Sequence, residues 1–213
     1  MRLITLPGVF QPRSDSWMLA DVVSRRARPG QAVLDPFTGS GILAIAAAQS
    51  GAETTAIDIS KRAVLCARLN ARLNGVRLRV LRAADLDPVG DRRFDLIVAN
   101  PPYVPSPDRE AQGAARAWEG GTDGRRFVDR MCAHASRYLR AGGRLLMIHS
   151  SVCGEDETLK RLEESGLTAR VLERQVGPVG PLMAAGMNGS GANGGPGSAD
   201  TEELLIFEAE APA

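Results

Sequence analysis

The feature that most constrains the fold is a repeated alternation between short apolar runs and longer segments with helical spacing. Runs of strand length occupy residues 31–34, 54–57, 76–81, 94–99, 144–148, 168–175 and 204–207. Helix-forming segments separate most of them. Parallel strands need a long crossover, which is usually a helix. The alternation therefore predicts an α/β three-layer sandwich with a seven-stranded, mostly parallel sheet.

Helix boundaries are also visible in the sequence. The segment 42–48 is rich in Ala, Ile and Leu. The next helix is expected to start after Ser60, which can cap it, and to stop at Asn74-Gly75. Periodic apolar positions from Phe127 predict a helix that ends at Gly142-Gly143, and another helix is expected over 155–165.

Composition narrows the class of protein. A chain of 213 residues with 44% hydrophobic residues is long enough to bury one full core, so one domain over 1–213 is expected. A net charge of +1 argues against general binding of polyanions such as nucleic acids. We expect no membrane span, no secretory signal and no metal site, and three widely spaced cysteines favour the cytoplasm. The glycine-rich stretch 186–198 is predicted to be a flexible loop.

Three aspartates follow three successive predicted strands. Asp35 opens the glycine turn that contains Gly39 and Gly41, Asp58 follows the second strand and Asp85 follows the third. A helix N-terminus attracts anions, but a leading carboxylate repels phosphate and suits an ammonium group. Asp58 could accept the two hydroxyls of a ribose, and Asp85 could accept an adenine amine.

Each aspartate alone is typical of a cap or a turn. Three of them at the carboxyl ends of successive strands favour a ligand with an amino-acid moiety, a ribose and an adenine but no phosphate. S-adenosylmethionine has this composition, and we expect it as the cofactor.

The strand at 94–99 runs into Asn100-Pro101-Pro102-Tyr103. The lone pair of an amide or aromatic amine nitrogen is delocalised, so such a nitrogen is a poor nucleophile. The Asn100 side-chain oxygen and the Pro101 carbonyl could each accept one N–H of a target NH2 group, which would aim the lone pair at a methyl donor. Tyr103 could pack on the planar target. His134 and His149 are not expected to be catalytic, and the cysteines are expected to be buried apolar residues.

These motifs resemble the class I methyltransferases that modify a planar nitrogen. Two further segments are similar to the HemK/PrmC-type glutamine methyltransferases. Residues 8–19 resemble their Pro-x-x-Asp-Ser/Thr arm, which we take as an N-terminal arm over 1–19, and residues 117–124 resemble their Trp-x-Gly-Gly-x-Asp-Gly segment. The resemblance covers residues 6–208 and is strongest to the short, single-domain branch of that family.

The resemblance implies methylation of the glutamine side-chain amide in the Gly-Gly-Gln motif of a class I release factor. It assigns cofactor contacts to one set of residues: Ser16 for the methionine end, Asp35 for its amine, Phe37 and Gly39 for the turn, Asp58 for the ribose, Asp85 and the Leu86 N–H for the adenine, and Asn100 beside the methyl group. It assigns the glutamine amide to Asn100, Pro101, Pro102 and Tyr103. The alternatives are that Ser16 caps a helix and that Trp118 belongs to a packed turn.

Other functions stay open at this level. Phe37 stands where the family usually has a glycine, and the sequence Asp-Pro-Phe-x-Gly-Ser-Gly is common in nucleic-acid methyltransferases, so a DNA or RNA amino-methyltransferase is the first alternative. A small-molecule N-methyltransferase and a non-catalytic cofactor-binding scaffold are the others. Some members of the short branch need a small zinc-binding activator protein, which is a candidate partner.

Overall fold

The computed structural model describes residues 1–106, 115, 117–190 and 201–213. Seven strands form one sheet in the order β3-β2-β1-β4-β5-β7-β6. The strands are β1 (Ala32–Asp35), β2 (Glu53–Asp58), β3 (Arg79–Arg82), β4 (Phe94–Ala99), β5 (Leu139–Ser150), β6 (Thr168–Pro178) and β7 (Thr201–Glu210). Only β7 runs antiparallel to its neighbours, β5 and β6. The predicted α/β fold with a mostly parallel sheet is confirmed.

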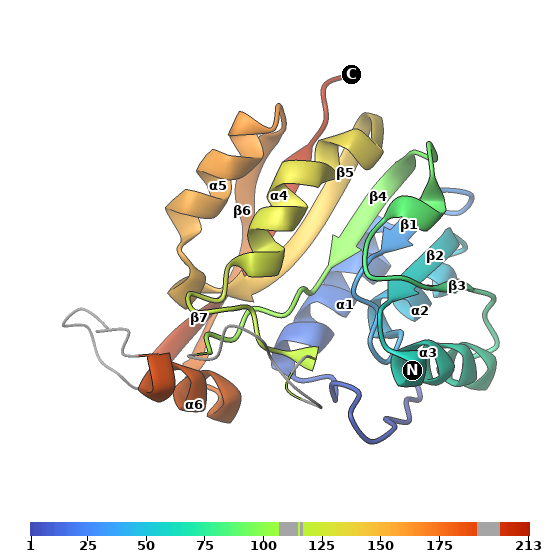
Figure 1. Cartoon of the computed structure of the whole chain (residues 1–213). Coiled ribbons are helices and arrows are strands. Elements are labelled where there is room, and N and C mark those ends of the chain that lie inside the picture. The colour runs from blue at the N-terminus through green and yellow to red at the C-terminus, as the bar shows by residue number, and fades with distance from the viewer. Residues whose placement is uncertain (107–114, 116, 191–200) are drawn as a thin grey trace.

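Helices cover both faces of the sheet (Figure 1). One face carries α1 (Ser14–Arg26), α2 (Ile42–Gln49) and α3 (Lys61–Leu73), and the other carries α4 (Arg126–Tyr138) and α5 (Glu155–Glu164). The side chains of strand β4 alternate between the two helix layers. Leu96 and Val98 pack toward α1 and α2, whereas Ile97 and Ala99 pack toward α4. Successive side chains of a strand point to opposite faces, so a strand covered on both sides is apolar throughout.

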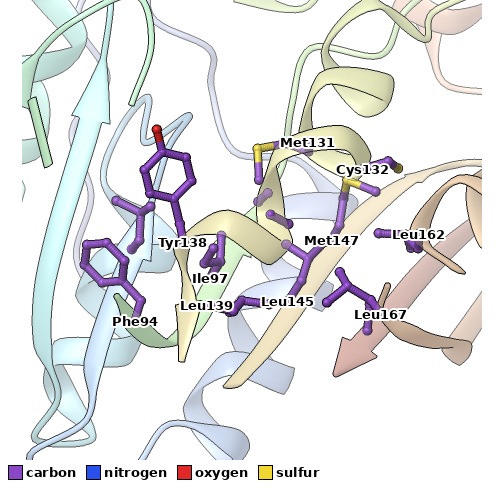
Figure 2. Packing of buried hydrophobic residues seen from close by; sticks show 14 of the residues in the cluster. Phe94, Ile97, Met131, Cys132, Tyr138, Leu139, Leu145, Met147, Leu162 and Leu167 are labelled. Atoms are coloured by element: carbon purple, nitrogen blue, oxygen red, sulfur yellow. The ribbon is translucent and has the colours of Figure 1, made fainter. Parts of the chain in front are cut away.

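Figure 2 shows the core between the sheet and α4. Phe94 and Ile97 of β4 meet Met131 and Tyr138 of α4, and Leu162 joins them from α5. Burying each large apolar side chain stabilises the fold by about 1.5–3 kcal/mol. This layer holds the sheet against α4 and thereby fixes the ends of its strands.

The structure corrects several boundaries. Strands β5, β6 and β7 are longer than the predicted 144–148, 168–175 and 204–207. Strand β3 begins only at Arg79, three residues later than predicted. Helix α4 ends at Tyr138, and the pair Gly142-Gly143 lies inside β5 instead of ending the helix. The pairing of β4 with β5 shifts its register there, and a Cβ on Gly143 would lie 2.9 Å from the Phe94 carbonyl oxygen. These glycines allow a bulge, which the sequence does not distinguish from a helix stop.

The predicted glycine-rich loop is also partly helical. Helix α6 (Pro181–Ser190) includes residues 186–190, and residues 191–198 lie outside the described residues. The close packing of α6 requires a glycine at position 186, because a Cβ on Gly186 would lie 2.2 Å from the Pro105 carbonyl oxygen. Helix α1 begins at Ser14, so the last residues of the predicted 1–19 arm are helical. Within the described part of the chain, no helix combines the length and hydropathy of a membrane span.

Candidate active site

The turn after β1 is a compact, hydrogen-bonded loop at the carboxyl edge of the sheet. The Thr38 N–H donates to the Ile57 carbonyl at 3.0 Å, which ties the turn to β2. Gly39 and Gly41 have positive φ angles, +50° and +89°. A Cβ on Gly41 would contact Ala67 of α3 at 3.1 Å, whereas the space beside Gly39 is open. Gly41 therefore lets two helices approach, and Gly39 lets a ligand approach the backbone.

Asp35 is fully buried at the start of this turn. Its Oδ2 atom accepts hydrogen bonds from Thr38 Oγ1 at 2.8 Å and from the Ala44 N–H at 3.2 Å, but its Oδ1 atom is buried without a partner. Burial raises the pKa of this carboxyl to about 7, and the Thr38 hydroxyl opposes the shift. An unpartnered buried carboxylate oxygen suits a cationic donor such as an ammonium group.

Asp58 links the turn to the next strand. Its Oδ2 atom accepts the Gly39 N–H at 2.9 Å, and its Oδ1 atom accepts the Ser60 N–H at 2.8 Å. Burial raises the pKa of Asp58, and these backbone donors oppose the rise. Each oxygen has a further lone pair, so the carboxylate can still accept two hydroxyl groups of a ribose.

The other predicted cofactor residues surround this centre less directly. Asp85 follows β3, and its Oδ1 atom accepts the Asp87 N–H at 3.2 Å. Phe37 and Leu86 pack against the core beside α4, and Phe37 makes an edge-to-face contact with Phe127 at 5.9 Å. The structure thus bonds Gly39 to Asp58 and ties Asp35 to the same turn through Thr38, whereas Asp85 bonds to Asp87. This set of carboxylate acceptors fits a nucleoside that carries an ammonium group.

Asn100 follows β4 and is held by the first helix. Its Nδ2 atom donates to Asp15 Oδ2 at 3.0 Å and to Ser16 Oγ at 3.1 Å. Asp15 Oδ2 also accepts the Tyr103 hydroxyl at 3.0 Å. An ionised carboxylate only accepts hydrogen bonds, so the amide must turn its NH2 group toward Asp15. The Asn100 Oδ1 atom consequently points away from Asp15.

Asp15 is the residue of this candidate site that the sequence prediction missed. It belongs to the arm motif that identified Ser16, and that position was the available signal. Both residues are buried in the first turn of α1, and the Ser16 N–H donates to Asp15 Oδ1 at 2.6 Å. The helix cap is Arg13, so the alternative that Ser16 caps the helix is wrong.

Tyr103 lies in an apolar setting beside a negative charge. Burial raises the pKa of its hydroxyl well above the usual value, and the Asp15 carboxylate adds to the rise through its charge and its hydrogen bond. The phenol therefore stays protonated at physiological pH and keeps donating to Asp15. This bond fixes the ring at the side of the Asn100 amide.

Asp15, Asn100 and Tyr103 line a cavity of about 80 Å³. Its walls come from the N-terminal segment, the Asn-Pro-Pro-Tyr turn, α6 and β7, and they include Phe10, Asn100, Pro101, Pro102, Tyr103, Trp118, Leu182, Met183 and Glu202. Trp118 is held alongside the turn because its carbonyl accepts the Val104 N–H at 2.9 Å. Trp118 therefore belongs to a packed turn and also lines the cavity.

His149 is buried in the core away from this cavity. Its Nδ1 atom lies 2.8 Å from the Ser150 carbonyl, its Nε2 atom lies 2.9 Å from Thr158 Oγ1, and its ring stacks on Phe207. Burial lowers the pKa of this imidazole to about 4. The three cysteines are free and buried, as expected. Burial raises the thiol pKa of Cys132 and Cys153 to about 12, so neither is a reactive thiolate.

Comparison with known proteins places the chain in a family. The methyltransferase small domain family matches residues 1–175. The release factor glutamine methyltransferase of Geobacter sulfurreducens is 37% identical over 165 residues, which are 73% of this chain and 57% of that protein. Human methyltransferase HEMK2 is 30% identical over 181 residues, which are 79% of this chain and 85% of that protein. The chain thus spans little more than half of the first relative and most of the second.

A solved structure agrees on the fold. The Mtq2–Trm112 complex of E. cuniculi, which is responsible for methylation of the translation termination factor eRF1, superposes with a TM-score of 0.67 at 22% identity. The match covers 96% of this chain and 99% of that chain. With its family match and these relatives, the chain belongs to the methyltransferase small domain family and, within it, to the HemK/PrmC-type glutamine methyltransferases.

Proposed function

We propose that this protein is an S-adenosylmethionine-dependent N-methyltransferase that methylates the glutamine side-chain amide in the Gly-Gly-Gln motif of a class I release factor. The observation that carries the proposal is the bond between Asn100 Nδ2 and Asp15 Oδ2, which turns the Asn100 oxygen away from Asp15 as an acceptor for a target NH2 group. Membership of the glutamine methyltransferase family supports the choice of target.

Asn100 and Pro101 orient the target. The Asn100 Oδ1 atom and the Pro101 carbonyl accept the two N–H groups of the amide, and Tyr103 and Pro102 pack on its plane. The bound cofactor supplies an electrophilic methyl group on a sulfonium. The two acceptors stabilise the positive charge that develops on the nitrogen, and the proton leaves only after transfer. No general base has to act beforehand, which agrees with the buried, structural role of His149.

Other residues of the chain hold the cofactor in this proposal. Asp35 Oδ1 takes the amine and Asp58 the ribose hydroxyls. Ser16 lies beside the methionine end, where its hydroxyl also contacts Asn100. Phe37 and Gly39 line the turn, and Asp85 and the Leu86 N–H meet the adenine. The orphaned Asp35 oxygen and the open space beside Gly39 support these roles.

Partner and location follow from the same resemblance. A small zinc-binding activator protein is a candidate partner, because the similar Mtq2 was solved in complex with Trm112. We place the reaction in the cytoplasm, where its substrate works and where free cysteines such as those here stay reduced. Size-exclusion chromatography of the chain expressed with and without such a partner would test the association.

The main alternative is methylation of a nucleic-acid base. Phe37 favours it, but a net charge of +1 offers little attraction for a polyanion. A small-molecule target is the second alternative. The relatives favour a protein target over both.

Mass spectrometry of a recombinant class I release factor tests the proposal. The factor is incubated with S-adenosylmethionine, with and without this protein, and the Gly-Gly-Gln peptide is measured. We expect one added methyl group only in the presence of the enzyme. No added methyl, with cofactor binding shown in parallel and the activator present, would overturn the proposed substrate and direct the search to nucleic acids and small amides.

A further inference from the structure

The described residues include three buried carboxylate oxygens that accept no hydrogen bond, on Asp35, Glu119 and Glu202. Glu202 lies near the start of β7 and lines the same cavity as Asn100 and Tyr103. We propose that Glu202 is a substrate-binding residue that accepts a hydrogen bond from a backbone N–H of the polypeptide beside the target glutamine. This inference rests on the proposed function, because it requires a polypeptide substrate.

The Glu202 carboxylate is held in place by one oxygen only. Its Oε1 atom accepts the Gly180 N–H at 2.9 Å, just before helix α6, and its Oε2 atom is left without a partner. The negative charge of Glu202 also contributes to the raised pKa of Tyr103, after burial and the contribution of Asp15. Glu202 and Tyr103 also line the same cavity.

The two carboxylates of the cavity have different tasks. Both oxygens of Asp15 are engaged, Oδ1 with Ser16 and Oδ2 with Asn100 and Tyr103. Glu202 Oε2 is thus the carboxylate oxygen, among the described residues that line this cavity, that accepts no hydrogen bond. A buried acceptor without a partner is unfavourable, and such groups in native proteins call for an explanation. A donor that arrives with the substrate supplies the missing bond.

The chemistry of the proposed substrate identifies the donor. A carboxylate accepts only N–H or O–H groups. Leu182 and Met183 of α6 and the ring of Trp118 make the neighbouring cavity wall largely apolar. The glycines that precede the glutamine in Gly-Gly-Gln have no side-chain donor. The backbone N–H groups are therefore the donors that this sequence offers beside the target amide.

Steady-state kinetics on the release factor test the role of Glu202. Glu202→Gln keeps the Oε1 acceptor for Gly180 and replaces Oε2 by an NH2 group, which opposes an incoming N–H. We expect KM for the release factor to rise about tenfold or more, with kcat within about threefold. Glu203→Gln is the matched control, because Glu203 is the adjacent residue and pairs with Arg174 at the partly exposed surface. We expect wild-type values for the control.

Modified peptides identify the bonded N–H without relying on one variant. In Gly-Gly-Gln peptides with N-methylglycine at one glycine or the other, or with an N-methylated glutamine backbone, one substitution should raise KM about tenfold for the wild type. The same substitution should raise KM no further for Glu202→Gln, because the two changes remove one bond. An unchanged KM in Glu202→Gln, or fully additive effects, would overturn the inference while the proposed function stands. A wild type that methylates none of these substrates would overturn both.

Discussion

At the scale of single residues, the site depends on Asp15 as much as on the Asn-Pro-Pro-Tyr turn. One oxygen of Asp15 holds both the Asn100 amide and the Tyr103 hydroxyl. An amide side chain can adopt two orientations that exchange its NH2 group and its oxygen. A nearby carboxylate selects the orientation that turns the NH2 group toward it. In the proposed mechanism, Asp15 is therefore a positioning residue, which acts on the target through Asn100.

Substitution of Asp15 tests this role. Asp15→Asn retains an oxygen for the Ser16 N–H but offers an NH2 group toward Asn100, so the amide loses its fixed orientation. We expect kcat to fall about 100-fold, with cofactor affinity within about twofold of wild type. Asp21→Asn is the control, because Asp21 lies on the same helix in an exposed ion pair with Arg25. A kcat equal to that of the control would contradict the role.

Removal of the acceptor itself has a larger expected effect. Asn100→Ala deletes the oxygen that would bind the target amide, and we expect turnover to fall by about 100- to 1000-fold while the cofactor still binds. Single-turnover assays at saturating cofactor, combined with calorimetry, separate the two quantities. Wild-type turnover in this variant would rule out the proposed mechanism.

The raised pKa of Asp35 predicts that cofactor binding depends on pH. Burial raises its pKa to about 7, and only the ionised carboxylate pairs with an ammonium group. Affinity for S-adenosylmethionine should therefore rise several-fold between about pH 6 and about pH 7, where an α-amino group is still mostly protonated. Calorimetry across this range measures the effect. Asp35→Asn should bind more weakly and show a flat profile, and a wild-type slope in that variant would exclude Asp35 as the titrating group.

At the scale of elements, helix α6, which lies between β6 and β7 in the chain, forms one wall of the cavity. Helix α6 contributes Leu182 and Met183 to the cavity, and its Gly186 packs directly on the segment that follows Tyr103. Intrinsic helix propensity gives little support to Gly-Met-Asn-Gly-Ser, so the tertiary contact with Pro105 supports the helix there. This explains why the sequence predicts a loop at 186–190.

Replacement of Gly186 tests that contact. Alanine normally favours a helix over glycine by about 1 kcal/mol. Here its Cβ would lie 2.2 Å from the Pro105 carbonyl, so α6 has to move. We expect Gly186→Ala to destabilise the protein by about 1–3 kcal/mol and to raise KM for the release factor. Gly177→Ala, where a Cβ meets nothing within 4 Å, is the control for both the thermal midpoint and the kinetics. A stabilised Gly186→Ala would show that α6 packs otherwise.

At the scale of the whole molecule, the repeated pattern of strands and helices could be predicted from the sequence. Contacts between residues that are far apart in the chain could not. Strand β4 matches its predicted bounds because it is apolar on both faces and ends at a polar motif. The link between Asp15 and Asn100 spans 85 positions of the chain, so no local pattern contains it. The β5 bulge and α6 likewise depend on close backbone approaches that only the assembled fold contains. The cofactor and substrate roles of the predicted site residues stay predictions until they are measured.

Two buried groups make global stability respond to pH in opposite directions. The pKa of His149 is lowered to about 4, so acidification protonates it first in the unfolded chain and stability falls from about pH 6.5 to about pH 4. The pKa of Asp35 is raised to about 7, so acidification protonates it first in the folded chain, and stability rises over nearly the same window. The two effects therefore oppose each other over this window.

Variants separate the two effects. Relative to wild type, His149→Gln should gain unfolding free energy as the pH falls from about 7 to about 4.5, and Asp35→Asn should lose it. Urea unfolding at a series of pH values gives these differences, since contributions from surface carboxylates are common to all three proteins. Parallel pH profiles for wild type and both variants would contradict the burial of these groups.

The place of β7 in the sheet has a consequence for how the chain is made. This strand lies between β5 and β6, both of which precede it in the chain, and among the described residues β6 has no other partner in the sheet. During synthesis, β5 and β6 therefore have unpaired strand edges until residues 201–210 have left the ribosome. The nascent chain is most prone to aggregation in that interval, and the wall that carries Glu202 is the last part of the cavity to form.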